Sequence, residues 1–267
     1  MPEIKQVAVG AEEDLELLIE AARNAGEIAR PYWRADPEVW DKGSGQGPVT
    51  EADLAVDRML HEYLLSERPE YGWLSEETVD TTSERLGKER VFIVDPIDGT
   101  RSFIHGDHNW AHSLAIAEEG EVIAAVVFLP LRERLFHAVK GQGAYLNDDP
   151  LIVTERCDLD GATVLAPRQH LDDEHWQGGA PKFIHKYRPS LAYRLTLVAQ
   201  GRYDAMFSFR DTWEWDVAAG TLILTEAGGQ VTDREGKAPV FNQPRPQLNG
   251  LVAGCPNLAD GILARLK

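Results

Sequence analysis

The spacing of apolar residues in the first third of the chain predicts two helices followed by two strands. Apolar side chains recur every three or four positions over residues 11–34 and over residues 50–66. This period is typical of helices that turn one face to a core. Short apolar runs at 71–75 and 91–95 end abruptly at acidic residues. Runs of this length, bounded by polar residues, predict buried strands.

The rest of the chain continues with strands and then mixes strands with helices. The predicted strands cover residues 113–117, 122–129, 134–139, 183–187, 203–209, 230–232 and 251–254. The predicted helices are residues 190–199, a segment that ends at Ala227, and residues 258–266. This mixture predicts an α/β or α+β fold. The loop-rich segment 151–180 divides the chain into residues 1–150 and 151–267, which form one large domain or two closely packed halves.

Composition narrows the classes of partner. Among the 267 residues, 44 acidic side chains outnumber 27 basic ones, and the net charge of −17 argues against binding to nucleic-acid polymers or anionic membranes. A small phosphorylated metabolite stays compatible, because a bound metal can reverse the local charge. Cys157 and Cys255 lack metal-ligand spacing and are interpreted as reduced thiols. The sequence shows no signal-peptide pattern, and its longest apolar run, 122–131, is about half of the roughly 20 residues that a membrane helix needs. We therefore expect a cytoplasmic protein.

The segment 91–103 carries the first candidate chemistry. The apolar strand 91–95 ends at Asp95, and Asp98 follows it three residues later across a proline. Burial of ionised carboxylates costs several kcal/mol unless a cation or hydrogen-bond donors compensate. A hard cation such as Mg²⁺, which prefers oxygen ligands, is the simplest compensation. Gly99 and Thr100 then open a helix, whose backbone N–H groups suit a phosphate.

Three further acids extend this pattern, and each also has a structural interpretation. Glu76 follows the neighbouring strand 71–75, so the two strand ends would bring Glu76 close to Asp95 and Asp98. Asp216 lies in the first turn of a predicted helix, where an acid also stabilises the helix dipole. Asp53 follows Thr50 at the spacing of a capping box and could serve only as a cap.

Other candidate features are less informative. The glycine-rich loop 41–48 could be a flap or a linker, and its Lys42 could reach a phosphate or remain solvated. His105, His108 and His112 lack the spacing of a zinc protease and are interpreted first as loop or sheet-end residues and second as substrate contacts. Neither a phosphate-binding P-loop nor a nucleophilic serine elbow is present.

Four sequence blocks together carry a family resemblance. They are Pro48-Val49-Thr50-Glu51-Ala52-Asp53, Trp73-Leu74-Ser75-Glu76-Glu77, Asp95-Pro96-Ile97-Asp98-Gly99-Thr100 and Trp215-Asp216-Val217-Ala218-Ala219-Gly220. In this order they resemble the inositol monophosphatase family of Mg²⁺-dependent, lithium-sensitive phosphatases, over nearly the whole chain. The resemblance implies a layered α-β-α-β-α sandwich that is usually a homodimer.

The resemblance also implies which residues bind metal. The first metal would be held by Glu76, Asp95 and the carbonyl oxygen of Ile97. The second would be held by Asp95, Asp98 and Asp216, so that Asp95 bridges the two ions. A third, weaker site would lie near Glu76. Two metals about 3.5–4 Å apart can neutralise a phosphate monoester, activate water and stabilise the leaving alkoxide.

The remaining implied roles concern water and phosphate. Asp53 and Thr100 would form a hydrogen-bonded pair that positions the attacking water, with Glu76 beside it. Glu77 would act nearby without binding the metal directly. The N–H groups of Gly99 and Thr100 would hold phosphate oxygens.

Substrate choice depends on a departure from the family pattern. Members that hydrolyse inositol phosphates carry a glutamate seven residues before the aspartate of the Trp-Asp block, and here that position is Phe209. We therefore favour adenosine 3′,5′-bisphosphate over inositol 1-phosphate, the alternative. Phe209 would support the base, and a second phosphate would meet one of the basic residues Lys182, Lys186, Arg188 and Arg210, each of which could instead be a solvated charge.

Other interpretations explain less of the sequence. Histidinol-phosphate phosphatases share the early motif, but the complete Trp-Asp-x-Ala-Ala-Gly block argues against that branch. A non-catalytic regulatory protein would be expected to have lost a metal ligand, and all five positions are retained. An acidic calcium-binding protein would not require acids at strand ends, and no EF-hand loop is present.

Overall fold

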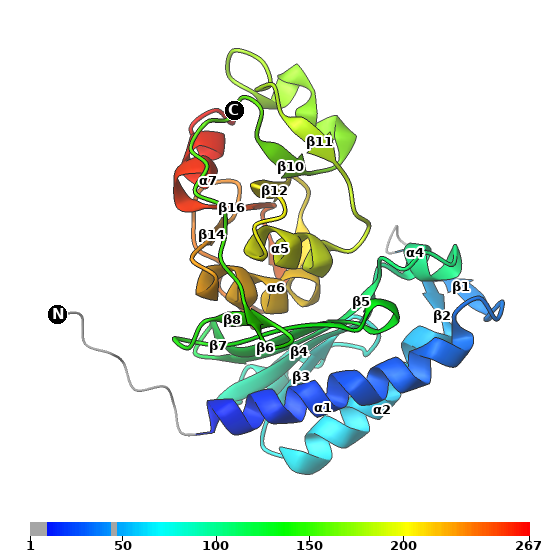
Figure 1. The fold of residues 1–267 in the computed structure, drawn as a ribbon. Coiled ribbons are helices and arrows are strands. Elements are labelled where there is room, and N and C mark those ends of the chain that lie inside the picture. The colour runs from blue at the N-terminus through cyan, green and yellow to red at the C-terminus, as the bar shows by residue number, and fades with distance from the viewer. Residues whose placement is uncertain (1–9, 44–46) are drawn as a thin grey trace.

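The computed structural model describes residues 10–43 and 47–267. Within the glycine-rich loop predicted at 41–48, residues 44–46 lie outside the described residues, as do residues 1–9. Seven α-helices are described, and α1 with α2, α5 with α6, and α7 form three layers separated by the two larger sheets (Figure 1). Their bounds are α1 Ala11–Ala29, α2 Glu51–Glu67, α3 Thr82–Arg85, α4 Thr100–Ile104, α5 Leu191–Ala199, α6 Glu214–Glu226 and α7 Pro256–Leu263.

The larger sheet has seven strands in the order β3-β4-β5-β6-β7-β8-β9. β3 and β4 are parallel, and every other neighbouring pair is antiparallel. Helices α1 and α2 cover one face of this sheet, and α5 and α6 cover the other (Figure 1). The strands are β3 Gly72–Ser75, β4 Arg90–Asp98, β5 Ala111–Glu118, β6 Glu121–Leu129, β7 Arg134–Val139, β8 Ala144–Leu146 and β9 Asp149–Pro150.

The second sheet lies beyond α5 and α6, with α7 on its outer side (Figure 1). Its order is β11-β10-β12-β16-β14, with β11, β10 and β12 parallel and the other pairs antiparallel. The two sheets and three helical layers confirm the α-β-α-β-α sandwich that the resemblance implies. The strands are β10 Thr163–Leu165, β11 Ile184–Lys186, β12 Ala205–Ser208, β14 Gln230–Thr232 and β16 Leu251–Gly254.

Short elements connect these layers, and most of them were not predicted. Two small antiparallel ribbons pair β1 with β2 and β13 with β15. Their bounds are β1 Val39–Asp41, β2 Pro48–Thr50, β13 Thr212–Trp213 and β15 Gln247–Leu248. Four 3₁₀ turns are also described, at Arg30–Tyr32, Pro130–Arg132, Arg168–Leu171 and Asp173–His175. Segments this short carry too little periodicity for a sequence pattern to reveal them.

Several boundaries differ from the sequence prediction, among them those of α1, β4 and α7. Helix α1 ends at Ala29 because Pro31 follows in a tighter 3₁₀ turn, whereas the pattern suggested a helix to residue 34. Strand β4 does not stop at Asp95 but continues to Asp98, with a register shift between the two acids. Helix α7 begins at Pro256, where proline suits the first helical turn.

Close helix packing joins the two halves of the chain. Gly220 in α6 faces α5, and a Cβ atom placed there would lie 2.6 Å from Leu195 Cβ, so the small residue sets the distance between the helices. The largest hydrophobic cluster includes Leu74 from the first sheet together with Leu195 and Val217 from α5 and α6. The division near residue 150 is therefore spanned by a shared core.

No helix within residues 10–43 and 47–267 combines the length and the apolar character that a membrane crossing requires.

Candidate functional site

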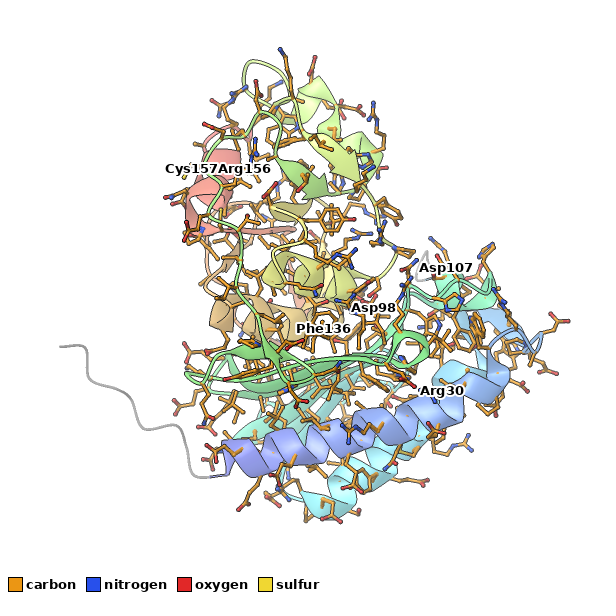
Figure 2. All side chains as sticks on the ribbon, in the orientation of Figure 1. Arg30, Asp98, Asp107, Phe136, Arg156 and Cys157 are labelled. Atoms are coloured by element: carbon orange, nitrogen blue, oxygen red, sulfur yellow. The ribbon has the colours of Figure 1, made fainter. Side chains whose placement is uncertain are left out.

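The edge of the first sheet gathers acidic side chains from three elements. β3 and β4 are parallel, so Glu76 just after β3 and Asp95 near the end of β4 point to the same edge. The first turn of α6 brings Asp216 to this edge from the second half of the chain. Carboxylate oxygens of Asp95, Asp98 and Asp216 all lie within 4.8 Å of one another. Figure 2 shows Asp98 where the half of the molecule with α5 and α6 meets the first sheet.

Asp95 is the least compensated member of this cluster. Its side chain is buried, and its Oδ1 has no hydrogen-bond partner among the residues that the structure describes. Burial, followed by the charges of Glu76, Asp98 and Asp216, raises the pKa of Asp95 well above its usual range. A buried carboxylate oxygen without a partner, in a cluster with two other carboxylates, fits a hard, oxygen-preferring cation.

Asp98 is held by the start of α5. The Ser190 hydroxyl donates to Asp98 Oδ2 at 2.6 Å, the Ala192 N–H donates to the same oxygen at 2.7 Å, and the Leu191 N–H donates to Oδ1 at 3.3 Å. Burial raises the pKa of Asp98 to about 6, although these hydrogen bonds oppose the rise. Ser190 also caps α5 by accepting from the Tyr193 N–H at 3.0 Å.

Asp53 serves two partners with its two oxygens. Oδ2 accepts from the N–H of Thr50 at 2.9 Å and from its hydroxyl at 2.5 Å, and the capping box predicted from the sequence is present. Oδ1 accepts from the Thr100 hydroxyl at 3.0 Å. Burial, only partly offset by the bonds to Thr50, raises the pKa of Asp53 to about 6. The cap and the contact to Thr100 therefore coexist.

Lys42 lies against the acids that follow β3. Its ammonium donates to Glu76 Oε1 at 2.8 Å and to Glu77 Oε1 at 2.6 Å, and its side chain is only 12% exposed. The sequence suggested a phosphate contact or a solvated charge, and the structure instead shows a partly buried ion pair. Burial and the charge of Glu76 raise the pKa of Glu77 to about 8, although Lys42 opposes this. Burial disfavours the charged form of Lys42, yet the two glutamates hold its pKa above the ordinary value.

Asp216 sits in the first turn of α6, directly after Trp215, whose ring stacks on that of Trp213. The two indoles lie 4.6 Å apart with an interplanar angle of 8°. Burial and the neighbouring charge of Asp98 raise the pKa of Asp216 well above its usual range, although part of the side chain reaches solvent. The carbonyl of Trp215 accepts from the Ser113 hydroxyl at 3.0 Å, which ties this turn to β5.

The turn between the two acids of β4 is supported from β5. His112 is fully buried, and its Nδ1 lies 2.5 Å from the Pro96 carbonyl. Burial lowers the pKa of His112 to about 4, so the ring is neutral near pH 7. Gly99 then takes a φ of 103°, a left-handed conformation that glycine adopts readily, and α4 begins at Thr100. The expectation of a helix after Gly99 is confirmed.

A cavity of about 570 Å³ opens between Glu76, the start of α4 and the start of α5. Of the residues expected at the site, Glu76, Gly99, Thr100 and Arg210 line it. Among the described residues, the other members of the expected site do not contribute to this lining, namely Asp53, Glu77, Asp95, Ile97, Asp98, Lys186, Arg188, Phe209 and Asp216. His105, for which a substrate contact was the second interpretation, also lines it, and the sequence did not single out several others that do, namely Arg101, Ser102, Asp107, Tyr187, Pro189, Leu191, Arg194 and Ser208.

Phe209 faces away from the cavity because strand residues alternate between faces. Ser208 lines the cavity, whereas the Phe209 ring stacks on His170 at 4.8 Å and on Phe207 at 5.1 Å between ring centroids, inside the outer core. The structure therefore does not bring Phe209 to the position where it would support a base. The position of Phe209 seven residues before Asp216 did not reveal this orientation, because a shift of one residue along a strand places the side chain on the opposite face of the sheet.

Comparison with known proteins agrees with this geometry. The model of the inositol monophosphatase family matches residues 11–266. The chain belongs to the inositol monophosphatase family. It is 36% identical to an inositol-1-monophosphatase of Rhizobium meliloti (83% of this chain, 86% of the relative) and 35% identical to one of Caulobacter vibrioides (80% and 87%). The family, the fold and the enzyme class expected from the sequence are thus confirmed.

A solved structure supports the same conclusion. The Bartonella henselae extragenic suppressor protein suhB superposes with a TM-score of 0.80, at 28% identity, over 94% of this chain and 97% of that one. This inositol monophosphatase family member is therefore a metal-dependent phosphomonoester hydrolase built on the family's layered fold. The preference for adenosine 3′,5′-bisphosphate gains no support from these relatives.

Proposed function

We propose that this phosphatase hydrolyses a small phosphate monoester with the aid of two Mg²⁺ ions, and that inositol 1-phosphate is its substrate. The observation that carries the proposal is the convergence of Asp95, Asp98 and Asp216. Leu191, whose N–H donates to Asp98, lines a cavity of about 570 Å³. The names of the relatives from Rhizobium meliloti and Caulobacter vibrioides favour inositol 1-phosphate, the alternative in our sequence interpretation, over a nucleoside bisphosphate.

The acids divide into two proposed metal sites. Glu76, Asp95 and the carbonyl of Ile97 would hold one ion, and Asp95, Asp98 and Asp216 would hold the other. The unpartnered Oδ1 of Asp95 supports its role as the shared ligand, because two cations would compensate a charge that the protein leaves unpaired. A third, weaker ion near Glu76, inhibition by Li⁺ and a homodimer belong to the same proposal, by family resemblance.

The protein's own groups would orient the reactants. Asp53 accepts from Thr100, so the pair would hold a water by one further hydrogen bond and align it with the phosphorus. The N–H groups of Gly99 and Thr100 would bind phosphate oxygens, and Glu77 would keep Lys42 beside the site. When bound, the ions neutralise the phosphate, lower the pKa of water and stabilise the leaving oxygen.

A second candidate substrate is favoured by the cavity wall. Arg101, Arg194 and Arg210 line the cavity together with Tyr187, which is 50% exposed. Arg194 also lies over the Tyr187 ring, with its guanidinium carbon 4.6 Å from the ring centroid. Three guanidinium groups suit a second phosphate, and an aromatic ring suits a base. Adenosine 3′,5′-bisphosphate therefore remains the second candidate.

Steady-state kinetics distinguish the two candidates. We expect Mg²⁺-stimulated phosphate release, with a higher kcat/KM for inositol 1-phosphate than for adenosine 3′,5′-bisphosphate or fructose 1,6-bisphosphate under one Mg²⁺ condition. A higher value for the nucleotide would replace the first candidate with the second. No Mg²⁺-stimulated release from any of the three would refute the proposed function.

A further inference from the structure

We infer that Glu214 is a positioning residue for the metal centre: it clamps the start of α6 to a distant loop and thereby fixes Asp216. The inference rests on the proposed role of Asp216 as a metal ligand. Glu214 is the first residue of α6 and precedes Asp216 by two positions, within the same helical turn. Its carboxylate is fully buried and accepts hydrogen bonds from the loop that follows β14.

Both oxygens of Glu214 are engaged by backbone donors. The N–H of Asn242 donates to Oε2 at 2.6 Å, and the N–H of Gln243 donates to Oε1 at 2.9 Å. The N–H of Glu214 itself donates to the Pro246 carbonyl at 3.0 Å. Asn242 has a φ of 59°, a left-handed conformation that costs a non-glycine residue free energy. The loop is therefore held in a strained turn that presents two consecutive N–H groups to one carboxylate.

Arg85 fixes the other side of the same loop. Its guanidinium is buried and donates to Asn242 Oδ1 at 2.6 Å and to the Gln243 carbonyl at 2.8 Å. It also donates to both oxygens of Asp80, at 2.7 and 2.9 Å. Arg85 and Asp80 lie in the connection between β3 and β4, the two strands that lead to Glu76 and Asp95.

This chain of contacts links the two sources of metal ligands. One source is the edge of the first sheet, and the other is α6, which lies on the face of that sheet opposite α1 and α2 (Figure 1). Apolar packing holds α6 against the sheet, but it is non-directional and does not by itself fix rotation or sliding of the helix. Paired hydrogen bonds to a charged group are directional and strong. Metal sites tolerate ligand displacements of only about 0.2 Å, so the clamp would set the affinity of the site.

The test is calorimetric titration of Mg²⁺ into the full-length, metal-free protein. Glu214→Gln keeps the shape of the side chain but turns one acceptor into a donor that faces a backbone N–H. We expect its dissociation constant for Mg²⁺ to rise at least five-fold. Asp14→Asn is the matched control, because Asp14 is an equally buried carboxylate that accepts from Arg68, Tyr71 and Arg90 on the far side of the sheet. Its affinity should stay within two-fold of the wild-type value.

The outcomes separate the inference from the function on which it rests. Equal Mg²⁺ affinity of Glu214→Gln and wild type would overturn the positioning role while leaving the proposed function intact. An equal loss of affinity in Asp14→Asn would also overturn it, because the effect would then follow from general destabilisation. No Mg²⁺ binding by the wild type would overturn both. If Glu214→Gln does not fold, the same titration is made with Arg85→Lys. Its dissociation constant for Mg²⁺ should rise at least five-fold, while that of Asp14→Asn stays within two-fold of the wild-type value.

Discussion

Replacement of Asp95 by asparagine should stabilise the metal-free protein while it abolishes activity. Asp95 is buried, one of its oxygens has no partner among the described residues, and Asp98 and Asp216 crowd it within 4.8 Å. In the folded, metal-free protein this carboxyl must either take up a proton or stay charged beside other carboxylates. Asparagine has nearly the same shape and avoids both costs.

Protonation of Asp95 and repulsion by its charged neighbours cost similar amounts of free energy. An aspartate with an ordinary pKa of about 3.9 costs about 4 kcal/mol to protonate at pH 7, since each pKa unit corresponds to about 1.4 kcal/mol. If it stays charged, each neighbouring carboxylate at 4.8 Å adds about 3.5 kcal/mol of repulsion at an effective dielectric constant of about 20. Asp95→Asn should therefore raise the free energy of unfolding by up to about 4 kcal/mol.

The stability advantage of Asp95→Asn over the wild type should increase with pH. The pKa of Asp95 is raised on folding, so its protonated form stabilises the wild type at low pH, and that stability is lost as pH rises. The advantage of Asp95→Asn should be absent near pH 4 and largest above pH 7. Saturating Mg²⁺ should reverse the order, because each ion at a hundred times its dissociation constant stabilises the wild type by about 2.7 kcal/mol.

Urea unfolding in EDTA and in Mg²⁺, at pH 4 and pH 7, measures all of these differences. Asp14→Asn serves as the contrasting variant, because Asp14 is paired with Arg68 and Arg90, and its loss removes the charge that compensates these two partly buried arginines. It should destabilise the protein in both buffers. A metal-free Asp95→Asn protein that is less stable than wild type at pH 7 would refute the reasoning.

Three further predictions follow from single contacts. Thr100→Val removes the hydroxyl that donates to Asp53 and should lower kcat about 10²-fold with little change in KM, as measured by steady-state kinetics; unchanged kcat would contradict the proposed pair. Arg210→Ala should raise KM for adenosine 3′,5′-bisphosphate about ten-fold and leave KM for inositol 1-phosphate unchanged, and equal effects on both would exclude a second phosphate site. Gly220→Ala places a methyl group 2.6 Å from Leu195 Cβ and should lower the free energy of unfolding by about 1–3 kcal/mol in urea; wild-type stability would show that the helices can separate.

Local patterns were sufficient to predict a mixed α and β class and to suggest that several acids lie together, whereas the layered sandwich followed from the family resemblance of four sequence blocks. Strand ends followed by carboxylates are local signals, and the parallel pairing of β3 with β4 made the proximity of Glu76 and Asp95 a direct consequence. The capping box at Thr50 and Asp53 was equally readable, because both partners lie within one helical turn.

Contacts between distant segments were not predictable in this way. Ser190 could be read as a helix cap, but nothing in its surroundings indicates that it also donates to Asp98, 92 positions away. The partner of Glu214 is a backbone turn that lies 28 residues further along the chain. Side chains that meet across layers leave no periodic trace in one sequence, so these contacts required the three-dimensional arrangement.

The contact between Asp98 and the start of α5 has a consequence for how the protein assembles. A carboxylate from the first half of the chain completes the N-terminus of a helix from the second half, with Ser190 and Ala192 as donors. The first sheet could form early, yet Asp98 would lack its final orientation until α5 docks. Competence to bind metal would then mark the last stage of folding, and a refolding chain would acquire it together with its complete core rather than before it.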